Sequence, residues 1–289
     1  MLERLDRLDR LVQDVLLNPP ALARAVTRLA AGEPHPIAGR TVLLTGASSG
    51  VGRAAAHALG AEGARLILVA RGADALRAVA DEVRAAGGQA ETLTADLSDP
   101  GETESLAKTV LDTHGRVDVL VNNAGRSIRR GAADATDRFH DYERTMALNY
   151  FGAARLTMAL LPSMLAAGNG HVVNVATWGV AAGSMPMFTA YHASKAALGA
   201  FGRSLAAETR AKGVHVTTVG FPLVRTEMIA PTGKYDRAAA LSPEQAAAWI
   251  VTAIRTRPLE LYPRYTRVLQ TLATVSPRTV DALIWRMGI

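Results

Sequence analysis

The sequence predicts an α/β fold, with a doubly wound parallel sheet flanked by helices. Short runs of aliphatic and β-branched residues alternate with longer segments of helical pattern over most of the chain. A glycine-rich turn joins the first apolar run to the first of these helices. The composition, 49% hydrophobic and 20% charged over 289 residues, is that of a globular chain that can bury one large core.

The composition also excludes several kinds of site. The chain has no cysteine, which excludes disulfides, thiolate metal sites and a cysteine nucleophile, and we expect no metal site. Its net charge of +6 comes mostly from arginines scattered among acidic residues, and this favours anionic ligands such as phosphates over nucleic acid. We therefore expect small-molecule partners and no nucleic acid.

No segment has the pattern of a signal peptide or a membrane span. Acidic residues precede any apolar run at the N-terminus. The longest apolar stretch, 156–167, is too short to cross a bilayer and contains Pro162. These features predict a cytoplasmic protein, with peripheral membrane contact as an alternative.

Residues 1–38 form the first predicted unit, a helical N-terminal extension. Apolar residues recur at helical spacing over 2–16, and a second helix is expected over 21–31. The pair could pack on the main domain or on a second subunit, or it could lie on a membrane or at a substrate entrance. We favour packing, because the apolar stripe carries no Trp or Phe.

The main domain, 39–262, begins with a strand over 41–44, a turn over 45–52 and a helix over 53–61. Glycines at 46, 50 and 52 let the backbone turn sharply and approach a pyrophosphate at the start of the helix. A glycine-rich turn in this strand-to-helix context predicts a dinucleotide site.

Arg71 follows the second strand, 66–69. Folds of this kind that hold NAD usually place an acid here, to bind the ribose 2′-hydroxyl. A guanidinium instead suits a 2′-phosphate, so the sequence predicts NADP(H), unless Arg71 is merely solvated.

The next two strands, 91–95 and 117–121, also end in polar or small residues. Asp96-Leu97 follows the first, near the expected adenine crevice. Asn122-Asn123-Ala124-Gly125 follows the second, where small residues allow close approach of a cofactor and the Asn pair can tie strands together. Beyond them, Arg126, Arg129 and Arg130 could clamp phosphates of a substrate's acyl carrier or form a solvated loop.

A long polar helix is expected over 137–150, with Asn149 at an unfavourable position inside it. A strand near 172–175 then leads through a glycine-rich loop into a helix that opens near Ala190. A sixth strand over 214–219, a helix over 243–256 and a short strand near 259–262 complete the domain. A helical C-terminal extension, 263–289, is expected to be broken at Pro277.

Tyr191 and Lys195 lie one turn apart on the helix that opens near Ala190, on the same face. An ammonium beside a phenol stabilises the phenolate and would lower the pKa of the tyrosine from about 10. Such a tyrosine can exchange a proton with a carbonyl oxygen.

Taken together, these motifs resemble the short-chain dehydrogenase/reductase family over about residues 38–262. The resemblance implies a Rossmann-type sheet, Tyr191 as acid/base, Lys195 on the nicotinamide ribose and Asn149 holding a proton-relay water. Val224 and Thr226 match the family's carboxamide contacts, although Phe221-Pro222 replaces the usual Pro-Gly. The implied cofactor-binding set is Gly46, Ser48, Ser49, Gly50, Val51, Gly52, Arg71, Asp96, Leu97, Asn123, Ala124, Gly125, Tyr191, Lys195, Val224 and Thr226.

The family's catalytic serine has no direct counterpart. Counted back from Tyr191, its position is held by Trp178. We infer a one-residue insertion and assign the role to Thr177, with Ser184 as the alternative.

A narrower resemblance, over 122–130, 137–152 and 222–232, is to bacterial short-chain-type fatty acyl-CoA reductases that form aldehydes. It implies NADPH-dependent reduction of an acyl-CoA thioester or of the derived aldehyde. Met185, Met187, Met228 and the apolar tail could line an acyl channel or belong to the core. The alternatives are a reductase of ketones or aldehydes and a catalytically silent NADP-binding protein. Family members are mostly dimers or tetramers, so we expect a homodimer or homotetramer.

Overall fold

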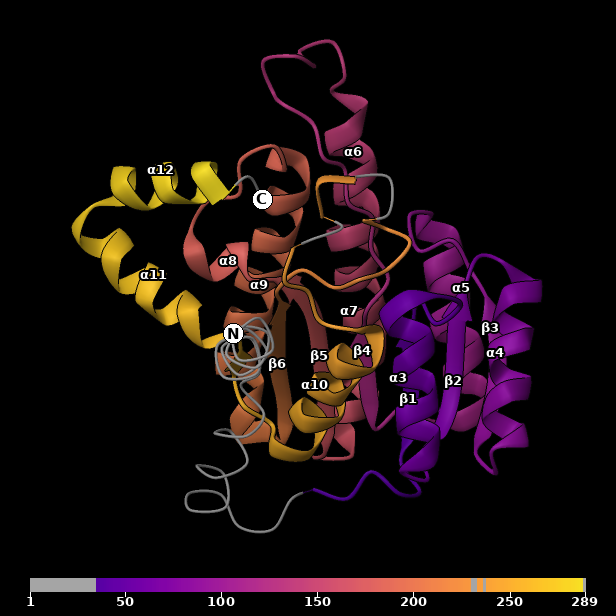
Figure 1. The fold of residues 1–289 in the computed structure, drawn as a ribbon. Coiled ribbons are helices and arrows are strands. Elements are labelled where there is room, and N and C mark those ends of the chain that lie inside the picture. The colour runs from indigo at the N-terminus through magenta and orange to yellow at the C-terminus, as the bar shows by residue number, and fades with distance from the viewer. Residues whose placement is uncertain (1–34, 230–232, 236–237, 288–289) are drawn as a thin grey trace, which may run out of the picture.

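The computed structural model describes residues 35–229, 233–235 and 238–287, so the helices expected over 2–16 and 21–31 lie outside the described residues. A single parallel sheet runs through the molecule in the order β3-β2-β1-β4-β5-β6-β7 (Figure 1). Its strands are β1 (Thr41–Thr45), β2 (Arg65–Ala70), β3 (Gln89–Thr94), β4 (Val119–Asn122), β5 (Gly170–Thr177), β6 (Val214–Phe221) and β7 (Glu260–Leu261). This confirms the predicted doubly wound sheet, because the strand order reverses direction between β1 and β4.

Helices cover both faces of the sheet. One face carries α3 (Gly50–Ala61), α4 (Ala73–Ala85) and α10 (Pro243–Thr256), and the other carries α5 (Pro100–His114), α7 (Ala153–Ala166) and α9 (Thr189–Thr209). Successive β1 side chains alternate between the two cores: Val42 and Leu44 pack into the first, and Leu43 into the second. Both faces are therefore buried, which explains why the strands read as continuous apolar runs.

The prediction of one long helix over 137–150 is wrong. The structure has a short helix α6 (His140–Met146), a π-helical turn η1 (Ala147–Gly152) and then α7. Asn149 lies inside the π turn, which explains how the chain accommodates an asparagine there. Such turns are frequent at functional sites.

The C-terminal residues form a hairpin of α11 (Arg264–Val275) and α12 (Pro277–Met287), with the predicted break at Pro277. This hairpin packs against α8 (Gly179–Ala182), the short helix that follows β5 (Figure 1). The buried residues of the contact are Trp178, Ala182, Leu269, Val280 and Ile284. The hairpin therefore supports a loop of the main domain.

The described residues also form short 3-10 turns at η2 (Arg210–Lys212) and η3 (Gly233–Tyr235).

Candidate active site

A cavity of about 700 Å3 opens at the carboxyl ends of the strands. Residues that follow β1, β2, β3, β4, β5 and β6 all contribute to its wall. Crevices at this edge, where the strand order reverses, are the usual binding sites of open α/β sheets. All of the predicted site residues line it except Asp96 and Asn149.

The glycine-rich turn forms one end of this cavity, and its glycines are required by the geometry. Gly46 has φ +65° and Gly50 has φ +50°, a region that favours glycine. A Cβ on Gly52 would lie 1.9 Å from the Gly46 carbonyl oxygen, and one on Gly46 would lie 2.8 Å from the Ala124 Cα. The turn therefore presents bare backbone at the start of α3, where amide groups attract an anion.

A hydrogen-bond network joins this turn to the end of β4. The Asn123 Nδ2 donates to the carbonyl oxygens of Thr45 and Gly46, and the Thr45 hydroxyl accepts from the amides of Asn123 and Ala124. Asn122 links β4 to β5 by donating to the Asn174 Oδ1 at 2.9 Å. The expectation that the Asn pair ties strands together is confirmed.

Tyr191 and Lys195 project from α9 into the cavity wall. The Lys195 Nζ donates to the Val175 carbonyl oxygen at 2.7 Å, and burial lowers its pKa to about 8. Burial raises the pKa of Tyr191 to about 12, opposed in part by a hydrogen bond with Thr177. This direction is opposite to the expected one, because desolvation disfavours the phenolate and the Lys195 ammonium is held by a carbonyl.

Thr177 and Ser184 differ clearly in their surroundings. Thr177 ends β5 and lines the cavity together with Tyr191, and its hydroxyl lies 3.9 Å from the Met185 Sδ. The Oγ of Ser184 is buried, has no hydrogen-bond partner among the described residues and is absent from the cavity wall. Trp178, which holds the serine position, buries its indole against the Tyr265 ring, at 5.7 Å between centroids. The geometry therefore favours Thr177.

Asn149 lies behind the cavity and is fully buried. Its Oδ1 accepts from the Arg126 amide at 2.8 Å, and its Nδ2 donates to the Arg126 carbonyl oxygen at 2.8 Å and to the Ser194 Oγ at 3.0 Å. A Cβ on Gly125 would lie 3.3 Å from the Asn149 Oδ1 and 3.2 Å from the Lys195 Nζ. Asn149 thus holds the chain after β4 against the helix that carries Tyr191 and Lys195.

The basic residues near the cavity do not act as one group. Arg71 lines the cavity at the end of β2 with 62% of its side chain exposed, and its Nη1 lies 3.7 Å from the Asp96 Oδ2. Arg129 lines the cavity from the opposite side, where it donates to the Tyr235 hydroxyl. Arg130 instead points to Asp141. Arg129 and Arg130 therefore face different hollows, and a phosphate clamp that includes Arg126 stays a prediction.

The end of the cavity near Tyr191 is apolar. Met185, Phe188 and Tyr235 form a buried cluster there, with Met187 and Leu223 packed against it. Met185 and Met228 line the cavity, as the acyl-channel hypothesis requires, but Met187, α11 and α12 do not. Sequence reasoning missed Tyr235, which follows the family motifs and carries no motif of its own.

Among the described residues, no group of three or more His, Cys, Asp or Glu is placed to hold a metal ion. Over the same residues, no helix is long and apolar enough to cross a membrane.

Comparison with known proteins places the chain in a family. Residues 40–236 match the family model described as short chain dehydrogenase. A fatty acyl-CoA reductase of Mycobacterium tuberculosis is 46% identical over 93% of this chain and 92% of its own length. A fatty acyl-CoA reductase of Acinetobacter baylyi is 44% identical over 83% of this chain and 81% of its own length. The crystal structure of a metagenomic short-chain oxidoreductase in complex with NADP superposes with a TM-score of 0.67, at 32% identity over 79% of this chain and 98% of that one. The protein is therefore an oxidoreductase that belongs to the short-chain dehydrogenase/reductase family.

Proposed function

We propose that the protein is an NADPH-dependent reductase of fatty acyl-CoA thioesters, or of the aldehydes derived from them. The observation that carries the proposal is that Thr177, Tyr191 and Lys195 line one cavity whose end near Tyr191 is apolar. Two relatives named as fatty acyl-CoA reductases, each above 40% identity, support the acyl-CoA substrate.

The cavity fits a dinucleotide that bears a 2′-phosphate. Bare glycine backbone at Gly46, Gly50 and Gly52 leaves room for a diphosphate, and a Cβ at any of them would meet neighbouring atoms. Arg71 offers a half-exposed guanidinium, with a planar donor fork, at the end of β2. When bound, NADPH supplies a hydride to the carbonyl carbon of the substrate.

Tyr191 is the proposed proton donor and Thr177 the second hydrogen-bond donor to the substrate oxygen. A pKa of about 12 keeps the Tyr191 phenol protonated throughout the neutral range, which is the form that a donor needs. Lys195 lies on the same wall and is proposed to bind the nicotinamide ribose. Asn149 is proposed to hold a proton-relay water.

Reduction of a thioester gives a hemithioacetal, in which the former carbonyl oxygen carries the proton from Tyr191. Breaking its carbon–sulfur bond forms the aldehyde and releases CoA as the thiol. A covalent thioester enzyme would need a cysteine, which the chain lacks. Direct reduction is therefore the route that we propose.

The test is an assay of the full-length protein with a long-chain acyl-CoA and NADPH, following both NADPH oxidation and release of free thiol. We expect both signals, with NADH a much poorer substitute, and a fall of about 10²–10⁴-fold in rate for Tyr191→Phe. Oxidation of NADPH with the fatty aldehyde but no thiol release from the acyl-CoA would identify a carbonyl reductase instead. Inactivity of the wild type on both substrates would favour the silent NADP-binding protein.

The assembly and the location of the protein stay predictions. A homodimer or homotetramer is expected, and sedimentation velocity tests it. Peripheral membrane contact is tested by co-sedimentation with anionic vesicles.

A further inference from the structure

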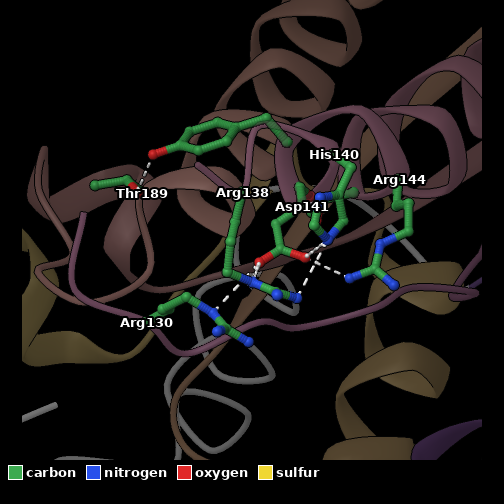
Figure 2. Close-up of polar contacts among 8 residues, drawn as sticks. Arg130, Arg138, His140, Asp141, Arg144 and Thr189 are labelled. Carbon is green, nitrogen blue, oxygen red and sulfur yellow. Dashed lines mark hydrogen bonds and ion pairs between the residues drawn. The ribbon is translucent and has the colours of Figure 1, made fainter. Parts of the chain in front are cut away.

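A buried aspartate gathers three arginines just outside the cavity (Figure 2). Asp141, at the start of α6, has only 5% of its side chain exposed. Its Oδ2 lies 3.3 Å from the Nε of Arg130 and 3.3 Å from the Nε of Arg138, and its Oδ1 accepts from Arg144. Burial opposes ionisation of Asp141, but the hydrogen bonds from Arg144 and Arg138 hold its pKa below the usual range. The carboxylate is therefore charged.

One carboxylate does not satisfy these arginines. Three guanidinium groups carry about fifteen N–H donors, whereas a carboxylate accepts about four hydrogen bonds. The Nε2 of His140 lies 3.1 Å from the Arg138 Nη2 and 3.4 Å from the Asp141 Oδ1. The three arginines and Asp141 together carry a formal charge of +2.

Other acidic residues do not cancel this charge by contact. Asp134, Asp137 and Glu143 lie on the same segment. In the part of the chain that the structure describes, none of the three forms an ion pair with these arginines. The side chains of Arg130, Arg138 and Arg144 are 44%, 36% and 48% exposed. Their spare donors therefore face solvent above a buried carboxylate that holds them in place.

Arg130 and Arg138 line a small hollow beside the cavity. Along residues 127–130, Ser127 and Arg129 face the cavity, whereas Ile128 and Arg130 face a small neighbouring hollow that Asp141 and Thr189 also line. The Tyr142 hydroxyl lies 2.7 Å from the Thr189 Oγ1, which ties α6 to the first residue of α9. Thr189 is two residues from Tyr191, so a substrate that leaves the cavity past this wall meets the arginines.

An exposed aromatic ring accompanies the charge. Phe139 is 69% exposed and stacks on Tyr142, with 5.7 Å between ring centroids and 17° between planes. Most of the Phe139 side chain is therefore open to solvent. An aromatic face beside arginines can take a nucleobase next to its phosphates.

We propose that Arg130, Arg138 and Arg144, positioned by Asp141, bind the phosphate groups of the CoA part of the substrate, with Phe139 against its adenine. This inference rests on the proposed function. Guanidinium forks match phosphate oxygens bidentately, and the buried carboxylate holds them ready before the substrate arrives. The pantetheine arm would then extend from these arginines to the thioester beside Tyr191.

The test compares the variants Arg138→Gln, Arg144→Gln and Phe139→Ala with the control Arg203→Gln. Arg203 is an arginine of α9 with 60% of its side chain exposed, pairs with Glu260 and is absent from the cavity wall. We expect each site variant to raise the KM for acyl-CoA about three- to tenfold. The kcat and the KM for the matching fatty aldehyde should stay as in the wild type. Calorimetry with free CoA, and with CoA that lacks the 3′-phosphate, should show weaker binding in both arginine variants.

Each outcome bears on one proposal only. An acyl-CoA KM unchanged in both arginine variants overturns the CoA site while the reductase stands. Equal increases in KM for acyl-CoA and aldehyde would indicate a structural role for the cluster and also overturn it. A wild type that binds CoA but does not reduce acyl-CoA, with binding lost in Arg144→Gln, would retain the site and reject the reductase.

Discussion

Thr177, the last residue of β5, and Trp178, the next residue, contact different parts of the molecule. The Thr177 hydroxyl meets Tyr191 at the cavity wall, while Trp178 turns its indole toward Tyr265. The Trp178 amide donates to the Phe221 carbonyl oxygen at 2.9 Å, and this fixes the chain at the end of β5. The serine position is thus filled by a packing residue, and the hydroxyl comes from the residue before it.

Replacing Thr177 by Val should lower kcat by about 10²-fold, since it removes a hydrogen-bond donor to the developing oxyanion. Thr177→Ser should retain most activity, because it keeps the hydroxyl. Ser184→Ala is the matched control and should change kcat less than twofold, since its buried hydroxyl has no partner to lose among the described residues. Steady-state kinetics with saturating NADPH measures all three. A larger loss in Ser184→Ala than in Thr177→Val would reverse the assignment.

The hairpin of α11 and α12 acts at the scale of whole elements. Its buried residues pack on α8, which directly follows Thr177 and Trp178. Ile284 is fully buried in this contact, whereas the adjacent Leu283 is 44% exposed. The position of the loop between β5 and α9 therefore depends on residues about a hundred positions later in the chain.

Ile284→Ala should weaken this contact by about 2–5 kcal/mol, the usual cost of emptying a buried aliphatic site. We expect a lower thermal midpoint and a lower kcat, because α8 and Thr177 lose their support, with NADPH affinity retained at the distant glycine-rich turn. Leu283→Ala makes the same chemical change at an exposed position and should behave as the wild type. Equal effects of the two variants would argue against support of the loop by the hairpin.

For the whole molecule, Lys195 is a buried charge that costs stability. Its side chain is 3% exposed, and burial lowers its pKa to about 8, whereas an unfolded lysine keeps its proton to about 10.4. Between pH 8 and 10 the unfolded chain therefore binds more protons at this residue than the folded protein does. The free energy of unfolding should rise with pH across this window.

Urea denaturation at pH 7.5, 8.5 and 9.5 measures this rise, which we expect to reach about 2 kcal/mol. Lys195→Met removes the titrating group, so its unfolding free energy should lack the rise and exceed that of the wild type near pH 7. Lys108→Met is the exposed control, at a residue paired with Asp112, and should keep the rise. The same pH slope in Lys195→Met as in the wild type would show that another group causes it.

Local patterns in the sequence were enough to predict the strands, most helices and most of the cavity wall. Apolar runs identify strands buried on both faces, and the spacing of Gly46, Gly50 and Gly52 identifies the turn after β1, because these features depend on near neighbours. The sequence did not predict the π turn at Asn149. The Asn149 side chain forms hydrogen bonds with Arg126 and Ser194, which are distant in sequence.

The sequence by itself therefore determined the order of the elements and much of the cavity wall, including the glycine-rich turn, Tyr191 and Lys195. Only the tertiary structure decided that Thr177 rather than Ser184 meets Tyr191, that the pKa of Tyr191 is raised, and that Asp141 gathers three arginines beside the cavity. Each of these depends on burial and on contacts between segments far apart in the chain. Such contacts form only when the sheet and its helices have packed.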